Sequence, residues 1–504
     1  MSKLTSSAIR KTEFSETISD VKIGLEIHVQ LTALTTKLFC GCPTDYRGMP
    51  PNSVCCPICL GLPGTLPVTN KRAIELAMMV SLALNSNISR NSSFYRKNYF
   101  YIDLPKDFQI SQYDKAGGVP IAIGGHVDFE MTHQEKLIRI RRLQLEEDPG
   151  RLKHIGMIDK SPYTLVDYNR SGITLLEIVT EPDFSTPEEA RVFLRKLRSV
   201  LEHLGVADVN LQGSLRCDAN ISVGDGRRVE IKNISSFKEV KRALNYEIIR
   251  QKQALRRGEF IAQETRHWDE DRRITFTLRT KEEEHDYRYF REPDLPTIEI
   301  SDDWIEKIKT TMPELPDARK ERFQKTYQIP AYDAEILTSE KYLADFFETC
   351  ITYDVDAKKV SNWLMSDFLR FVNELDLEFS EILLTPEDLV TMIRLIDQEV
   401  ISGKIGKTVL REMLATGKTP QTIIEELGLE KIDNTSIISD KVKKVFEEYP
   451  DAVRDAMTNK NAIRYLVGQV MAKTRGRADP VLTNEIIELK LEELKSKNTK
   501  LDEN

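Results

Sequence analysis

Four of the seven cysteines form two close pairs in one short stretch of the chain. One residue separates Cys40 from Cys42, and thirteen residues later Cys56 and Cys59 enclose Pro57-Ile58. Two such pairs, joined by a loop rich in Pro and Gly, can place four thiolates tetrahedrally around Zn²⁺. Four thiolates leave no open coordination position, so the spacing predicts structural rather than catalytic zinc. Four reduced, buried thiols are the alternative interpretation.

Carboxylates form the second group of candidates. Glu26 and His28 are two residues apart, which on a strand puts both side chains on one face; an ordinary exposed face is the alternative to a metal or acid–base site. Glu146-Glu147-Asp148 is typical either of an exposed acidic turn or of a Mg²⁺ site, because hard cations prefer carboxylate oxygens. Glu177 lies in the apolar run Leu175–Val179, where a carboxylate is unfavourable unless a metal, a base or a hydrogen-bond donor compensates it.

Several segments mix cations and amides with other polar or aromatic side chains. Such side chains suit phosphate groups and the packing of a base or sugar, although a solvated strand end has the same composition. The segments are Arg96–Tyr101, the strand face with Arg216, Asp218 and Asn220, the pair Lys232-Asn233, and Asp286–Tyr289. A basic patch at residues 473–477 fits either the C-terminus of a helix or contact with a nucleic-acid backbone.

The hydrophobic pattern predicts the elements that carry these residues. Unbroken alternation over Val21–Leu31 predicts a strand, and residues 214–223 and 227–234 predict two more. Helix-capping residues at Thr186 and Ser236 predict helices that end at Gly205 and Gly258. After Pro296 helical spacing replaces the alternation. We therefore expect an α+β fold with a disordered N-terminus (1–20), a large mixed-sheet domain (21–296), an all-α helical domain (297–405) and a small α-helical tail domain (406–504).

The composition and charge of the chain exclude some classes of function. The chain has 504 residues, of which 40% are hydrophobic and 30% charged, an ordinary globular balance. Its formal net charge of −8 argues against a general polyanion binder, so nucleic-acid contact needs a local basic patch. No secretory signal or membrane span is evident, and we expect a soluble, cytoplasmic protein. Because no G-x-x-x-x-G-K-[ST] motif is present, any use of ATP must proceed without a P-loop.

Many ordered motifs together resemble the B subunits of the tRNA-dependent amidotransferases, the GatB family. The resemblance extends from about Val21 to Leu491 and includes the residues weighed above. The matching stretches are IGLEIHVQL, CPICLGLPGTLPVTNKRAIELA, RKNYFYIDLPKDFQISQYD, LQLEEDPGR, LVDYNRSG, LLEIVTEPD, GSLRCDANIS, EIKNISSF and DYRYFREPDLP. The stretch LVGQVMAKTRGRADPVLTNEII is similar to the YqeY-type helical module of the same subunits.

The resemblance implies a ligase that forms a carbon–nitrogen bond with glutamine as amide donor. The family phosphorylates, with ATP, the side-chain carboxylate of Asp on tRNA-Asn or of Glu on tRNA-Gln. Ammonia then displaces phosphate. A partner amidase, the A subunit, supplies the ammonia, and a small C subunit completes the heterotrimer. The sheet domain resembles the family's cradle, which holds the kinase site and the tRNA acceptor end.

The resemblance also implies roles for particular residues. Implied Mg²⁺ ligands are Glu26, His28, Glu147 and Glu177. The cysteine loop occurs in only some members of the family, so the prediction of Zn²⁺ on Cys40, Cys42, Cys56 and Cys59 rests on their spacing. Implied catalytic residues are Glu146, Glu147, Glu177 and Lys97. Implied ATP and substrate contacts are Asn98, Tyr99, Asn169, Arg170, Asp218, Asn220, Lys232, Asn233, Asp286 and Arg288. Implied tRNA contacts are Lys473, Arg475 and Arg477.

Two other interpretations compete. The related archaeal GatE subunit serves Gln-tRNA formation but carries a large extra domain between its cradle and its helical part, which the sequence after Pro296 lacks. A non-catalytic, zinc-containing tRNA-binding subunit would explain the cysteines and the basic patch. It would leave Glu177, Glu26 and His28 without an explanation.

Overall fold

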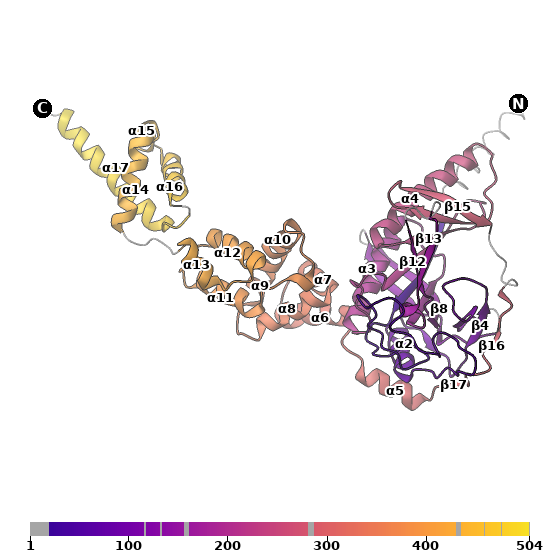
Figure 1. Cartoon of the computed structure of the whole chain (residues 1–504). Coiled ribbons are helices and arrows are strands. Elements are labelled where there is room, and N and C mark those ends of the chain that lie inside the picture. Colours follow the sequence, from indigo (N-terminus) through magenta and orange to yellow (C-terminus); the bar gives the residue numbers. More distant parts are fainter. Residues whose placement is uncertain are drawn as a thin grey trace, which may run out of the picture. The chain divides into compact units, whose positions relative to one another are not determined.

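The computed structural model describes residues 20–114, 117–131, 134–155, 161–280, 287–429, 435–457, 459–474 and 476–502. By its contacts the chain divides into two compact units, Met1–Ala318 and Arg319–Asn504 (Figure 1). A large mixed sheet with helices, followed by a helical region, confirms the predicted α+β class. Residues 1–19 of the predicted disordered N-terminus and the candidates Asp286 and Arg475 lie outside the described residues, as does the side chain of Asn233.

One mixed sheet organises the first unit. Its main path follows the order β15-β14-β13-β12-β1-β11-β8-β5-β4-β16, with β6 and β7 also paired to β8 and β2 paired to β6. The strands are β1 (Val21–Gln30), β2 (Asn87–Ile88), β4 (Tyr95–Asn98), β5 (Phe108–Ser111), β6 (Ala122–Ile123), β7 (His126–Met131), β8 (Gln134–Glu147), β11 (Thr174–Thr180), β12 (Leu215–Val223), β13 (Val229–Ile234), β14 (Glu264–Asp269), β15 (Ile274–Thr280) and β16 (Phe290–Arg291). Two small sheets pair β9 (Arg151–His154) with β10 (Thr164–Asp167) and β3 (Asn91–Ser92) with β17 (Ile298–Glu299).

Strand β1 shows the predicted alternation. Ile23, Ile27 and Val29 are fully buried, whereas Glu26 and His28 are half-buried on the other face. The helices α2 (Lys71–Ala83), α3 (Pro187–His203) and α4 (Phe237–Arg256) pack against strands of the sheet and share one core with the buried side of β1 (Figure 1). Because the helices cover one face, the polar side chains of β1 lie on a face that remains open to ligands.

The predicted caps of the two long helices are confirmed. The Thr186 hydroxyl accepts the N–H of Glu189 at the start of α3, and the Ser236 hydroxyl accepts the N–H of Glu239 at the start of α4. These oxygens satisfy N–H groups that the first helical turn leaves without partners. Gly205, with φ of +64°, follows the last turn of α3.

The core of the sheet continues beyond Pro296, where our predicted domain ends. Helix α5 (Asp302–Thr311) contacts α2 and adds Ile305 and Ile308 to the same core. Helix α6 (Pro316–Tyr327) contains the division between the two units.

The second unit is helical and contains two cores. One includes buried residues from Phe323 to Leu429, and the other from Ile438 to Leu491. The predicted boundary between residues 405 and 406 falls inside α12, whose Ile405 and Val409 both belong to the first core, so our domain limits stay a prediction. The elements are α7 (Ala331–Ser339), α8 (Lys341–Ile351), α9 (Ala357–Trp363), the π-helical turn η4 (Leu364–Phe368), α10 (Leu369–Glu374), the 3₁₀ turn η5 (Phe379–Glu381), α11 (Pro386–Asp397), α12 (Gly403–Thr416), α13 (Pro420–Leu427), α14 (Thr435–Glu448), α15 (Pro450–Ala456), α16 (Lys460–Lys473) and α17 (Pro480–Asp502).

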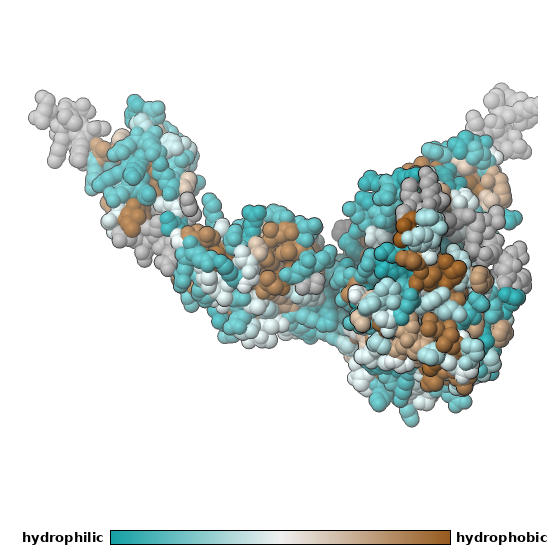
Figure 2. Space-filling view, viewed as in Figure 1, coloured by the Kyte–Doolittle hydropathy of each residue, from teal (hydrophilic) through white to brown (hydrophobic). Residues whose placement is uncertain are grey.

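The hydropathy of the visible surface is consistent with the burial of apolar side chains in these cores. Figure 2 shows mainly hydrophilic residues on the visible face of both units, with smaller apolar patches. Within the part of the chain that the structure describes, no helix combines the length and the apolar character that crossing a bilayer requires.

The packing of α3 on the sheet predicts a large effect for one substitution. Phe193 is fully buried and its ring meets that of Phe184 edge-to-face, with 5.1 Å between the centroids. Phe193→Ala should lower the free energy of unfolding of the first unit by about 3–5 kcal/mol, because it removes buried contacts and leaves a cavity. The exposed control Gln253→Ala on α4 should change it by less than about 0.5 kcal/mol. Denaturant unfolding checks both, and equal midpoints for the two variants would contradict this account of the core.

Candidate functional site

The open face of the sheet contains a cavity of about 1080 Å³, lined by residues of the first unit. Strand register brings its polar residues together. In the antiparallel pairs of β1, His28 lies opposite Glu177 of β11 and Arg216 of β12, and Glu26 lies opposite Asp218 of β12. Directly paired residues have neighbouring side chains on one face, so distant segments converge on one row.

Three titratable side chains meet at the centre of the cavity. His28 Nε2 lies 3.3 Å from Glu146 Oε1 and 3.7 Å from Glu177 Oε2. Ligand atoms of the three residues lie within 4.8 Å of one another. Glu146 and Glu177 are 6% and 7% exposed, so two buried carboxylates face one imidazole. Such an arrangement requires positive charge, which the imidazolium or a bound cation supplies.

The pKa values of this group reflect that requirement. Burial by itself lowers the pKa of His28, but the hydrogen bond and negative charge of Glu146, with the charge of Glu177, raise it to about 9. Burial favours the neutral acid of Glu146, but the hydrogen bond to His28, together with the positive charges of His28, Lys97 and Arg216, lowers the Glu146 pKa to about 2. Burial, followed by the charge of Glu146, raises the pKa of Glu177 to about 7. Glu177 is therefore the carboxyl that exchanges protons near neutral pH.

Two side chains from β8 support Glu177. Gln144 Nε2 donates to Glu177 Oε2 at 2.8 Å, and Arg142 Nη2 lies 3.5 Å from Glu177 Oε1. Sequence reasoning missed both residues. Arg142, Gln144 and Glu146 alternate in the sequence and share one face of β8, so a strand prediction over residues 140–147 would have found them.

The structure does not place Glu147 in this group. Glu147 occupies the opposite face of β8 from Glu146, because successive side chains of a strand alternate. Its carboxylate accepts a hydrogen bond from Lys106 Nζ at 2.6 Å and one from the N–H of Ile110 at 2.9 Å. It lines a separate cavity of about 190 Å³. Glu146 has the position expected of Glu147, beside His28 and Glu177.

A second polar group lines the cavity toward β12 and β13. Asn220 Nδ2 donates to Glu26 Oε1 at 3.0 Å, and Lys232 Nζ donates to Asp218 Oδ2 at 3.0 Å. Burial raises the pKa of Asp218, but the charges of Lys232, His28 and Arg216 and the hydrogen bond from Lys232 together lower it. The charge of Asp218 in turn raises the pKa of Lys232, against burial. The register brings these four candidates together; Asp218 and Lys232 form an ion pair, and Glu26 accepts a hydrogen bond from a neutral amide.

Aromatic rings and one amine form another wall of the cavity. Lys97 Nζ lies 4.7 Å from the ring centroid of Tyr287 and 5.3 Å from that of Tyr99. Tyr113 stacks on Tyr289 with 4.6 Å between the centroids. Burial lowers the pKa of Lys97, although the charge of Glu146 opposes it. The wall combines the flat apolar surfaces of the rings with a buried amine. Tyr113 was not among the predicted site residues.

Four of the nucleotide and substrate candidates lie outside this cavity. Asn98 Nδ2 donates to the carbonyl of Arg288 at 2.8 Å, and Arg288 itself is exposed. Asn169 is fully buried and binds the N–H of Val54 at 2.7 Å. Arg170 donates to the carbonyls of Pro149 and Gly150 at 2.9 and 2.7 Å. The last two residues hold loops in place, so their contacts here are structural.

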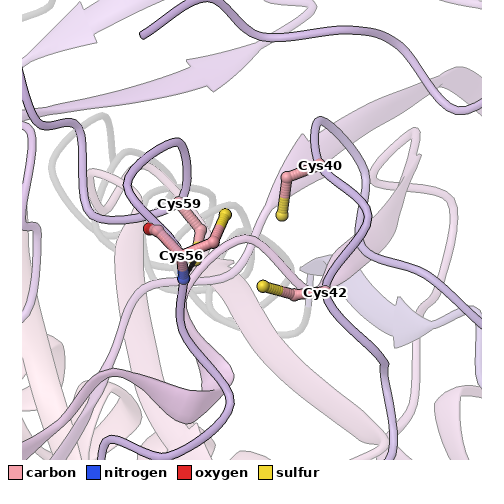
Figure 3. A group of neighbouring side chains, drawn as sticks. All are labelled: Cys40, Cys42, Cys56 and Cys59. Atoms are coloured by element: carbon pink, nitrogen blue, oxygen red, sulfur yellow. Dashed lines mark hydrogen bonds between the residues drawn. The ribbon is translucent and has the colours of Figure 1, made fainter.

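The four predicted cysteine ligands converge at a second site. Their sulfur atoms lie within 4.8 Å of one another, and Figure 3 shows the two pairs approaching from separate turns. All four are free thiols, and Cys59 is buried. A hydrogen bond from Cys40 lowers the pKa of Cys59, whereas burial raises the pKa of Cys42 to about 12. Cys59 therefore loses its proton more readily than Cys42 even without a metal.

The basic patch at residues 473–477 lies in the second unit. Lys473 Nζ donates to Glu448 Oε1 at 2.7 Å. Arg477 donates to the carbonyls of Gly428 and Thr474 at 2.6 and 3.2 Å. Both cations thus have partners within the chain, and neither contact involves a buried carboxylate.

Comparison with known proteins identifies the family of the chain. Residues 21–306 match the family model of the GatB/GatE catalytic domain, and residues 345–491 match that of the GatB domain. Three relatives are each named as the B subunit of an aspartyl/glutamyl-tRNA(Asn/Gln) amidotransferase. The protein of Sulfurisphaera tokodaii is 50% identical over 93% of this chain and 98% of its own, that of Thermotoga maritima 50% over 93% and 98%, and that of Saccharolobus solfataricus 49% over 94% and 99%. The predicted resemblance and the predicted ligase class are both confirmed, and the chain belongs to the GatB family of amidotransferase B subunits.

Proposed function

We propose that the cavity of the first unit binds ATP and a misacylated tRNA end, and that it amidates the aminoacyl side chain. The substrates are Asp on tRNA-Asn, Glu on tRNA-Gln, or both. The observation that carries this proposal is the group of His28, Glu146 and Glu177 within one large cavity that also contains cations and an aromatic wall. That combination suits phosphoryl transfer, in which positioning and charge stabilisation provide most of the catalysis.

The reaction has two balanced steps. A carboxylate oxygen of the substrate attacks the γ-phosphorus of ATP, and the bond to ADP breaks. Ammonia then attacks the carbon of the acyl phosphate, phosphate leaves, and one proton is released. Phosphorylation is needed because a carboxylate has no acceptable leaving group of its own.

The donor set of the central group fits a divalent cation. Glu146 and Glu177 would provide oxygen ligands and His28 a nitrogen ligand, all within 4.8 Å. When bound, Mg²⁺ would offset the charge of the ATP phosphates beside an anionic substrate. Gln144 and Arg142 hold Glu177 in place from β8, since both contact its carboxylate. Glu26 lies two residues before His28 on the same face of β1, so it would act beside this group rather than within it.

The remaining walls of the cavity provide substrate contacts. Lys97 and Arg142 can donate to phosphate or carboxylate oxygens, and Arg142 also lies 5.4 Å from the ring of Tyr113. The rings of Tyr99 and Tyr287 offer a surface for a base or a sugar. Asp218, Asn220 and Lys232 lie across the cavity and would contact the other end of the substrate.

Three further assignments belong to the proposal. The four cysteines hold structural Zn²⁺, because their sulfurs converge and leave no open position. The module around Lys473, Arg475 and Arg477 contacts tRNA. The chain works with an amidase A subunit, which supplies ammonia, and with a small C subunit; the relatives are named as parts of a larger enzyme, which supports such a complex.

The GatE-type alternative lacks support. The family-model matches end at residue 306 and resume at residue 345, which leaves no room for a large inserted domain. The non-catalytic alternative remains an outcome of the first experiment below.

Separate substitutions of the neighbouring carboxylates Glu146 and Glu147 test the site. With the co-expressed complex, ATP, Mg²⁺ and ammonium chloride, Glu146→Gln should reduce amide formation on misacylated tRNA by roughly 100-fold or more, because it removes a charge from the central group. Glu147→Gln is the matched control, since Glu147 faces the other side of β8 and can keep its hydrogen bond from Ile110. We expect it to retain activity within about tenfold of the parent.

Two outcomes would contradict this assignment. Equal losses in both variants would remove the distinction between the two faces of β8. An inactive parent complex that still binds tRNA would support the non-catalytic, zinc-containing tRNA-binding role instead.

Magnesium affinity should depend on pH. In the ion-free site His28 holds a proton up to about pH 9 and Glu177 up to about pH 7, and a cation must displace these protons. Affinity should therefore rise about tenfold per pH unit between pH 7 and 9, and more steeply below pH 7. Calorimetric titration with Mg²⁺ at several pH values measures this slope, and His28→Gln should flatten it above pH 7. An affinity independent of pH over this range would argue against His28 as a ligand.

Removal of the last core tests the tRNA assignment. The core of α14–α17 is separate from the core that ends at Leu429, so a chain that stops after residue 434 should keep its other two cores. Its complex should bind tRNA more weakly and with a shallower dependence on salt, by a slope of about 0.9 for each lost phosphate contact. Filter binding at several salt concentrations measures both values. Unchanged affinity and slope would show that this module does not contact tRNA.

A further inference from the structure

Lys37 is a fully buried lysine beside the cysteine cluster. Its ammonium donates to the carbonyl of Val54 at 2.8 Å and lies 3.8 Å from Sγ of Cys59. Among the residues that the structure describes, no carboxylate forms an ion pair with it. By contrast, the nearby Lys106, whose side chain is 11% exposed, pairs with the carboxylate of Glu147.

Two hydrogen bonds hold Lys37 in position. The N–H of Lys37 donates to the carbonyl of Cys42 at 2.9 Å, within the turn that carries the first cysteine pair. Its Nζ reaches Val54, just before the second pair. Lys37 therefore connects the two turns that bring the four sulfurs together.

A buried ammonium without a counter-charge is strongly unfavourable. The sulfur of Cys59, 3.8 Å from the ammonium, can become an anion, and it belongs to the cluster. Four thiolates around one divalent cation carry a net charge of −2, which is also unfavourable in a buried setting. Each of the two buried charges thus compensates the other.

We propose that Lys37 is the counter-charge of the cysteine cluster and increases its affinity for a divalent metal. The proposal rests on the zinc site proposed above and adds a residue that is not itself a ligand. Lys37 is a positioning residue, which acts through the charge of the thiolates and through the spacing of the two turns. Residues next to metal ligands commonly change metal affinity by about 10–100-fold.

The test compares three variants of the full chain, purified with Zn²⁺ under reducing conditions. Lys37→Met removes the charge and the hydrogen bond to Val54, whereas Lys37→Gln removes the charge but keeps a donor. Lys106→Met is the matched control, because it removes a buried ammonium that already has a carboxylate partner. Competition with a chromogenic chelator measures the zinc affinity of each protein.

Both Lys37 variants should bind Zn²⁺ about 10–100-fold more weakly than the parent, and Lys106→Met should bind like the parent. Thermal unfolding gives a second readout. Lys37→Met should lower the melting temperature of the zinc-loaded protein by more than that of the zinc-free, reduced protein, because the cluster carries less negative charge without zinc. A residue that only fills space would lower both melting temperatures equally.

The outcomes separate this inference from the zinc assignment. If the parent chain binds no zinc, the zinc site itself is wrong and the inference falls with it. If the parent binds zinc and both Lys37 variants bind it equally well, the zinc site stands and the counter-charge is wrong. If Lys37→Gln binds like the parent while Lys37→Met does not, the hydrogen bond to Val54 rather than the charge is responsible, which also overturns the proposal.

Discussion

The pairing of β1 with β11 and β12 is the constraint on which the site depends. It places His28 between Glu177 and Arg216, and β8 adds Glu146 from the next strand beyond β11. The positive charge of His28 between the two buried carboxylates stabilises them there, together with Arg142 beside Glu177. A shift of β1 by one residue would move His28 to the helix-covered face and leave the carboxylates without that charge. The pairing of β1 therefore brings the charged side chains together, and the attraction between them favours this register in turn.

Much of the fold could be predicted because its signals are local. The alternation of Val21–Leu31 and the caps at Thr186 and Ser236 depend on neighbouring residues, and the structure confirms each of them. The end of the sheet domain depends on distant packing instead. Helix α5 has an ordinary amphipathic sequence, and its packing on α2 and on the core of the sheet assigns it to the first unit.

The site itself was predicted in part, and each difference has a physical reason. Sequence alone did not show which of Glu146 and Glu147 faces His28, because we had not predicted β8 as a strand, and alternation gives opposite faces to neighbours. The family resemblance implied that Asn169 and Arg170 contact substrate, but their hydrogen bonds with Val54 and Gly150 follow from loop packing. Glu177 was recognisable because a carboxylate in an apolar strand requires compensation wherever the strand lies.

The cysteine cluster and the cavity are supported by different parts of the fold. The cluster is tied to the turn after β10: the hydroxyl of Ser171 donates to the carbonyl of Cys59 at 3.3 Å, and the N–H of Gly172 donates to the carbonyl of Asp148 at 2.9 Å. Asp148 in turn accepts a hydrogen bond from Arg216 at 2.7 Å, at the edge of the cavity. His28 and Glu177 instead lie on strands that the sheet ladder holds directly. Because the group of His28, Glu146 and Glu177 is built on strands and the cluster on loops, a metal at the cysteines can stabilise the edge of the cavity near Arg216 without determining the geometry of that group.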